Sequence, residues 1–133
     1  MFYDFVLTIP ANTPVSKPVV STGVVCPGRV DRVMIIFPPG AAGLAHIRIA
    51  RGSHQLWPTN LDGSFASDGE FLDFSENYPL DDPPFEFIIS GWNDDDTYDH
   101  SITVRFNIVP VEQAAKPGLT DQIKTFLGVG RIP

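Results

Sequence analysis

The chain of 133 residues contains a single cysteine, Cys26, and no long hydrophobic run. One cysteine excludes a disulfide within the chain and a cysteine-based zinc site, and it is typical of proteins made in a reducing compartment. No apolar run approaches the roughly 18 residues that a membrane helix requires. Residues 2–9 resemble a strand and lack the basic and apolar regions of a signal peptide, so we expect no secretory leader.

Basic residues are also scarce, and the nine Lys and Arg form no cluster along the chain. Sixteen Asp and Glu give a formal net charge of -7. This balance predicts neither nucleic acid nor an anionic membrane as a partner, because both are bound through basic surfaces. A negative surface is also a common source of solubility, so the charge by itself identifies no partner.

Catalytic motifs are missing as well. The sequence has no Gly-rich phosphate loop and no HExxH pair. The pairs Ser53-His54 and Asp99-His100 lack a third orienting residue at a recognisable spacing. His46, His54 and His100 match no metal-binding spacing, and His100 is expected to be a hydrogen-bonded structural residue. We therefore predict a protein that is not an enzyme and that holds no cofactor or metal.

The clearest feature that is present is the alternating stretch 98–109, YDHSITVRFNIV. A period of two predicts a strand with one face in a core. The residues predicted to point inward are His100, Ile102, Val104, Phe106 and Ile108. Thirteen Pro and eleven Gly indicate many turns and few helices in the rest of the chain.

Other stretches predict short strands of the same kind. In residues 44–51, Ala45, Ile47 and Ile49 are expected to point inward, and His46 and Arg48 outward. The remaining predicted strands are residues 2–9, 19–26 with a bulge at Gly23, 29–37, 55–57, 70–75 and 85–91. About seven or eight short strands between turns predict an all-β, antiparallel sandwich. Pro-rich connections at 10–18 and 77–84 favour a jelly-roll or Greek-key order of strands.

The pattern stops at Pro110, which divides a predicted sandwich domain, 1–110, from a C-terminal tail, 111–133. Thr120 is positioned to cap a short helix in the tail. Ile123, Phe126 and Leu127 would line one side of that helix, which is too short to persist alone in water. These three residues are the predicted partner-binding site. Docking on a neighbouring subunit and docking on the chain's own sandwich both remain open.

Two surface sites have competing interpretations. The loop Asp94-Asp95-Asp96, with Asp99, could supply oxygen ligands to calcium, although it lacks the DxDxDG spacing. Its carboxylates could instead bond their own backbone in a solvated turn. Trp57 and Trp92, in or beside loops, could stack on sugar rings, or they could pin irregular segments by packing.

Two segments carry a resemblance to known proteins: HQLWPTNLDGSFASDG at 54–69 and GWNDDDTYDHSITVRFNIVP at 91–110. Together with the N-terminal strand, they resemble small proteins encoded beside the head genes of tailed bacteriophages. The resemblance covers residues 1–110 and excludes the tail. It implies a virion component, either a jelly-roll capsid decoration protein or a connector-region accessory.

These observations predict a non-enzymatic bacteriophage structural protein. It would be made in the host cytoplasm, act in the virion, and bind the viral capsid protein or sister subunits as a homo-oligomer. The alternative is a carbohydrate-binding sandwich module that uses Trp57 and Trp92. A third possibility is a protein that acts on the host through surface mimicry, which an acidic surface permits.

Overall fold

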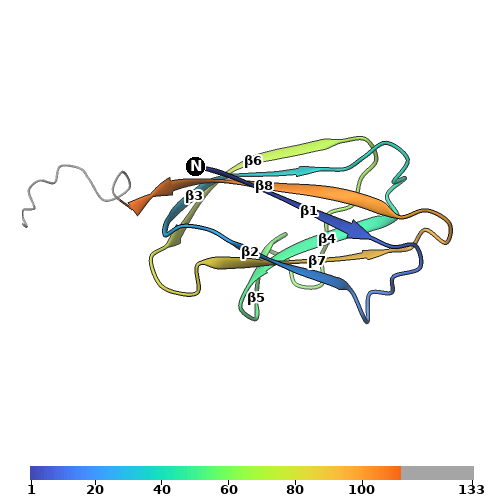
Figure 1. The fold of residues 1–133 in the computed structure, drawn as a ribbon, viewed down its shortest axis with the longest axis horizontal. Coiled ribbons are helices and arrows are strands. Elements are labelled where there is room, and N and C mark those ends of the chain that lie inside the picture. Colours follow the sequence, from blue (N-terminus) through green and yellow to red (C-terminus); the bar gives the residue numbers. More distant parts are fainter. Residues whose placement is uncertain (112–133) are drawn as a thin grey trace, which may run out of the picture.

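A computed structural model describes residues 1–111, which contain eight β-strands (Figure 1). Their bounds are β1 Phe2–Ile9, β2 Val19–Val24, β3 Gly28–Ile36, β4 Ala45–Arg51, β5 His54–Trp57, β6 Phe71–Leu80, β7 Glu86–Asn93 and β8 His100–Pro110. Every strand predicted from the sequence is present; the strand at residues 2–9 has the predicted ends, and the others have shifted ends. Within the described residues, no helix is long and apolar enough to cross a membrane.

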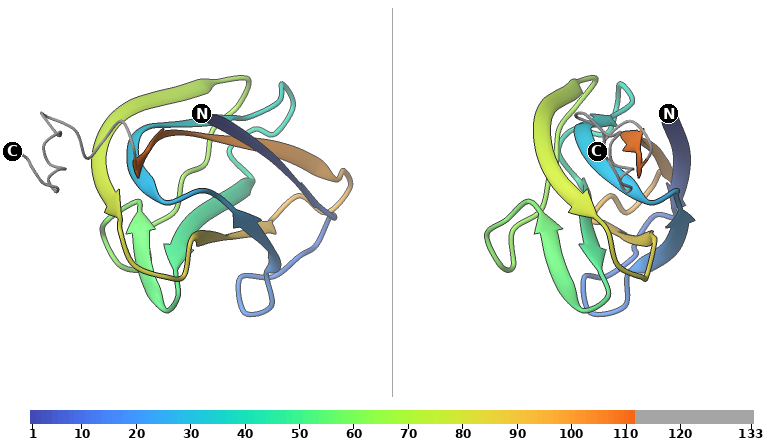
Figure 2. Two further views of the ribbon diagram at one scale, coloured as in Figure 1. Left: turned by 60° about the vertical axis from the view of Figure 1, so that its left-hand side comes forward. Right: turned by 90° about the vertical axis from the view of Figure 1, so that its left-hand side faces the viewer.

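The strands form two antiparallel sheets of four strands each. Sheet A has the order β1-β8-β3-β6, and sheet B has the order β2-β7-β4-β5. Figure 2 shows the two sheets as facing layers, and one cluster of buried apolar side chains fills the space between them. The predicted all-β, antiparallel sandwich is therefore confirmed.

The strand pairs are nested along the chain. The first strand pairs with the last, β2 with β7, β3 with β6, and β4 with β5. The chain thus resembles one long hairpin that has been rolled up. The pairs β3–β8 and β4–β7 then complete sheets A and B respectively.

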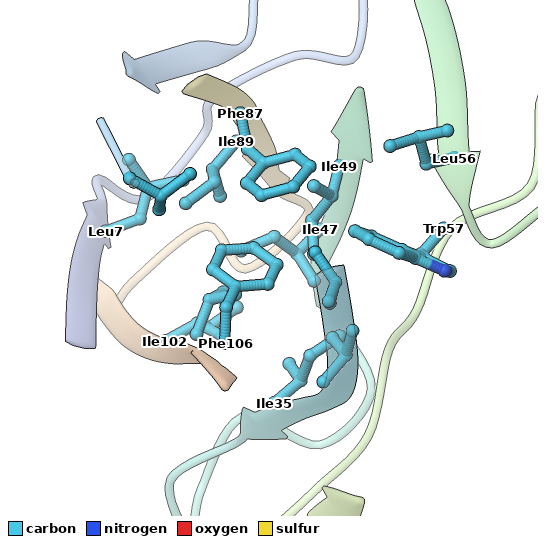
Figure 3. Close-up of a cluster of buried hydrophobic side chains, with 14 of the residues drawn as sticks. Leu7, Ile35, Ile47, Ile49, Leu56, Trp57, Phe87, Ile89, Ile102 and Phe106 are labelled. Atoms are coloured by element: carbon cyan, nitrogen blue, oxygen red, sulfur yellow. The ribbon is translucent and has the colours of Figure 1, made fainter. Parts of the chain in front are cut away.

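The core is centred on β8, as its alternation predicts. Ile102, Val104, Phe106 and Ile108 are fully buried, and His100 is 7% exposed. The ring of Phe106 stacks on that of Phe87 from the opposite sheet, with ring centroids 4.6 Å apart (Figure 3). This contact joins the two layers near their middle, because β8 is a central strand of sheet A and β7 is a central strand of sheet B.

Two predicted details are wrong. The strand predicted to end at Ser75 continues through Pro79 to Leu80, because β6 lies at the edge of sheet A, where a missing N–H can face solvent. Gly23 marks no bulge, and its pairing with β7 is regular. The ring of Phe5 occupies the space of a side chain there, only 2.7 Å from where a Cβ at position 23 would lie.

Candidate functional site

The two tryptophans lie on opposite faces of sheet B. Trp57 ends β5 and is 4% exposed; its ring packs between the sheets against Phe87 and Phe106 (Figure 3). Trp92 belongs to β7, pairs with His46 on the outer face, and is 7% exposed. The predicted sugar-stacking platform is therefore wrong, since the two rings share no surface and neither is open to a ligand.

Trp92 is buried on an outer face because two side chains of β4 cover it. The imidazole of His46 is nearly parallel to the indole, at 4° and with ring centroids 4.9 Å apart. The guanidinium carbon of Arg48 lies 4.9 Å from the centre of the Trp92 ring. Alternation in β4 places both residues on this face, so their predicted outward orientation is confirmed. Trp92 itself lies within a strand, where its cross-strand neighbours are fixed by register.

His46 also joins two distant parts of the chain. Its Nδ1 lies 2.9 Å from the hydroxyl oxygen of Ser64, and its Nε2 lies 3.1 Å from a carboxylate oxygen of Asp94. The tautomer with its proton on Nε2 satisfies both contacts, because Nε2–H then donates a hydrogen bond to Asp94 and Nδ1 accepts one from the Ser64 hydroxyl. The order Ser-His-Asp is that of an activated nucleophile, and no pair identified from the sequence included these residues.

Gln55 holds the loop that leads to Ser64. Its side-chain nitrogen faces three loop carbonyl oxygens at 2.8, 3.1 and 3.3 Å, those of Pro58, Asn60 and Gly63. Just after Ser64, Phe65 exchanges two backbone hydrogen bonds with Ile47 of β4. The segment 58–64 is therefore anchored at both ends and forms a rim beside the outer face of sheet B.

A groove of about 270 Å³ lies against this rim. It is lined by parts of the chain that are far apart in sequence, including Arg48, Ser53, Gln55, Leu61, Asp62 and Ser90. Leu61 is 77% exposed at the rim. The groove thus combines one cation, one carboxylate, neutral polar groups and an exposed apolar side chain. The length of the segment 52–69 was the signal available in the sequence, because long loops of compact domains are usually functional or self-packed.

Asp95 organises the acidic loop from within. One carboxylate oxygen accepts backbone N–H bonds from Thr97 and Tyr98, at 2.9 and 3.2 Å. The other lies 2.8 Å from Nε2 of His100. The hydrogen bond from His100 and then those from the backbone lower the pKa of Asp95, because each favours the charged carboxylate. The structural, hydrogen-bonded role predicted for His100 is confirmed.

The other carboxylates of the acidic loop have separate partners. Asp94 contacts His46, Asp96 accepts a hydrogen bond from the hydroxyl of Thr97, and Asp99 accepts one from the backbone of Ala11 at 2.9 Å. Within residues 1–111, no group of three or more His, Cys, Asp or Glu is arranged to hold a metal ion. The calcium hypothesis therefore has no ligand cluster in this part of the chain, and a carboxylate–backbone turn describes the loop.

The predicted partner-binding residues Ile123, Phe126 and Leu127, with the predicted helix around them, lie outside the residues that the structure describes. No protein-family model matches the sequence, and no curated protein matches it.

Proposed function

We propose that the chain is a non-enzymatic structural protein of a virus particle. In this proposal it is a capsid decoration or head-accessory protein of a tailed bacteriophage, and it binds the capsid lattice or sister subunits. It is made in the host cytoplasm and acts in the virion, with neither nucleic acid nor a membrane as its partner.

The observation that carries the proposal is the nested strand pairing. Pairs of first with last, second with seventh, third with sixth and fourth with fifth strand, divided between two sheets, support an eight-stranded jelly roll. Viral capsid proteins and lectin domains both use this architecture. The resemblance of residues 1–110 to proteins encoded beside phage head genes favours the virion over the lectin.

Apolar side chains on the strands also support association with other subunits. Five of them are each more than half exposed: Phe2 and Val6 in β1, Val20 and Val24 in β2, and Phe71 in β6. All three strands lie at sheet edges, where unpaired backbone groups are available to a neighbour. Exposed apolar groups and open edges together suit a protein that works in an assembly.

The Ser64–His46–Asp94 contact is compatible with a non-enzymatic role. The side chain of Asp94 is 56% exposed, so water screens its charge and weakens its hold on the imidazole. The ring of His46 lies flat against Trp92. In this interpretation, His46 fastens the rim at Ser64 to the end of β7 and does not activate a nucleophile.

Mass spectrometry tests the proposal directly. The particles produced by the genome that encodes the chain would be purified by density gradient, and their proteins identified. We expect this chain at a fixed ratio to the major capsid protein, retained after a salt wash. Its absence from particles, with the protein recovered only free in the lysate, would refute a virion role.

Deletion of residues 112–133 tests the part assigned to the tail. We expect the shortened chain to keep its melting temperature and to lose self-association or binding to particles, because Ile123, Phe126 and Leu127 would be missing. Light scattering and circular dichroism on both chains provide the comparison. An unchanged assembly state with a melting temperature lowered by several degrees would show that the tail instead covers its own sandwich.

A further inference from the structure

We propose that the groove on the outer face of sheet B binds a sugar that carries a carboxylate, such as a uronic acid residue of a surface polysaccharide. In this proposal Arg48 binds the carboxylate, and the side chains around it bind the sugar hydroxyls. The inference goes beyond the virion role, because it concerns a second kind of ligand, a sugar and not a protein subunit.

Arg48 is the residue that selects the ligand. Its guanidinium is placed by its contact with Trp92, which a cation–π interaction stabilises. Within residues 1–111, the ion pairs of the chain are made by other side chains, and Arg48 takes part in none of them. An arginine held in place with its N–H donors unmatched presents a planar fork that fits a carboxylate.

The rest of the lining suits a hydroxylated ring. Asp62 offers two acceptor oxygens to sugar hydroxyls, and Ser53 and Ser90 can both donate and accept. Leu61 is largely exposed at the rim, where it can cover the C–H face of a pyranose ring. Together these groups can contact both the hydroxyls and the apolar face of a sugar ring. A site for a simple anion would need no apolar side chain.

The size and stiffness of the groove also favour a single sugar residue. A volume of about 270 Å³ lies just below the range of about 300–1,000 Å³ found for drug-sized ligands. Gln55 fixes the rim through three carbonyl contacts, so little ordering is required when a ligand binds. The open side leaves room for a longer glycan to continue beyond the bound residue.

The charge of the groove disfavours polyanions. Its lining contains one arginine and one aspartate, and the chain as a whole carries a net charge of -7. A phosphate-rich ligand would meet repulsion from Asp62 and from the overall field. A single carboxylate on a neutral ring places its charge at Arg48 only.

Titration of the full-length, isotope-labelled chain with D-glucuronate, followed by amide chemical shifts, tests the inference. We expect shifts at Arg48, Ser53, Leu61, Asp62 and Ser90, with a Kd of about 1 mM, as a ligand of this size allows. Glucose and acetate serve as matched probes, and each should bind at least about tenfold more weakly, because each lacks half of the recognised groups.

Three variants test which side chains of the groove bind glucuronate. Arg48→Met should weaken glucuronate binding at least about tenfold. Asp62→Asn and Leu61→Ala, both at exposed positions, should weaken it severalfold without changing the fold. Arg105→Met is the control, since Arg105 pairs with Asp4 on the outer face of sheet A, and it should leave binding unchanged.

Several results would contradict the proposed sugar site. No shifts at these residues, or equal binding by acetate or glucose, would overturn the proposal. Unchanged affinity in Arg48→Met would also overturn it, because Arg48 is the residue proposed to bind the carboxylate. If Arg48→Met fails to fold, loss of affinity in Asp62→Asn and Leu61→Ala still supports the site, and its absence refutes it.

Discussion

Trp57 and Trp92 are almost equally buried, at 4% and 7% exposed, yet they are covered by different kinds of neighbour. Trp57 is enclosed by aromatic rings between the sheets, and its indole N–H donates to Glu76 at 2.7 Å. Trp92 lies on an outer face beneath His46 and Arg48, both of which are partly open to water.

The difference shows that low exposure alone does not define a core residue. Removing Trp57 would leave a cavity that fixed apolar neighbours cannot fill. The side chains over Trp92 are polar, reach water, and can rearrange if the ring is lost. Trp57 therefore stabilises the sandwich, whereas Trp92 mainly positions the charged groups of the outer face.

The largest effect is expected from Trp57→Ala compared with Trp92→Ala. The first should lower the free energy of unfolding by about 3–5 kcal/mol, because it empties an enclosed site. The second should lower it by about 1–2 kcal/mol, as expected for a substitution outside the core. Urea denaturation followed by circular dichroism measures both. Equal losses would show that the outer cluster is as rigid as the core.

A second effect is expected on the acid side of the stability profile. Because the fold lowers the pKa of Asp95, its ionised form stabilises the folded chain above the ordinary aspartate pKa of about 3.9. That contribution is lost as the pH falls through the lowered pKa of the folded state. Melting temperatures measured from about pH 5 to about pH 3 should therefore fall less steeply in Asp95→Asn than in the parent.

The neighbouring exposed residue provides the control for that measurement. Asp96→Asn removes the same charge from the same loop without touching His100. Its profile should keep the slope of the parent. A slope reduced equally by both substitutions would assign the acid sensitivity to the net charge of the loop and not to the Asp95–His100 contact.

A smaller effect is expected from Ser64→Ala, which removes one hydrogen bond to His46. The loss should be about 0.5–1.5 kcal/mol, because the contact ties the rim to the sheet in a partly exposed position. The parent chain should also remain unlabelled by a fluorophosphonate probe. Labelling at Ser64 that disappears in His46→Gln would contradict the structural role and indicate an activated serine.

The smallest effect on stability is expected from Arg48→Met. The contact with Trp92 is a cation–π pair near water, so its removal should cost under about 1 kcal/mol. Thermal melts of this variant beside Arg105→Met, which loses the ion pair with Asp4 on sheet A, make the test quantitative. A loss of several kcal/mol for Arg48→Met alone would place Arg48 among the residues that hold the sandwich together.

Local patterns predicted most of the fold. Alternation in 98–109 was sufficient to identify the buried face of β8, because burial on one side imposes a period of two. The end of β6 was not predictable in the same way. Pro79 is acceptable only because β6 lies at an edge, and edge position depends on the order of strands, which no local pattern contains.

The candidate site was less accessible to sequence reasoning. Trp92 and His46 are 46 positions apart, and they meet only through the register of β7 and β4. Ser64 reaches the same histidine because Phe65 rejoins the edge of β4. The length of the segment 52–69 is visible in the sequence, but only the register of the strands determines which side chains this segment contacts.

The nested pairing also has a kinetic consequence. The β4–β5 hairpin closes over two residues, Gly52 and Ser53, whereas β1 must find a partner about a hundred positions away, with Phe2 opposite Asn107. Closing a longer loop costs more entropy, and non-local pairing slows folding. We therefore expect the chain to fold outward from its central hairpin, with β1 and β8 joining last. During synthesis, β1 would wait unpaired until nearly the whole sandwich had left the ribosome.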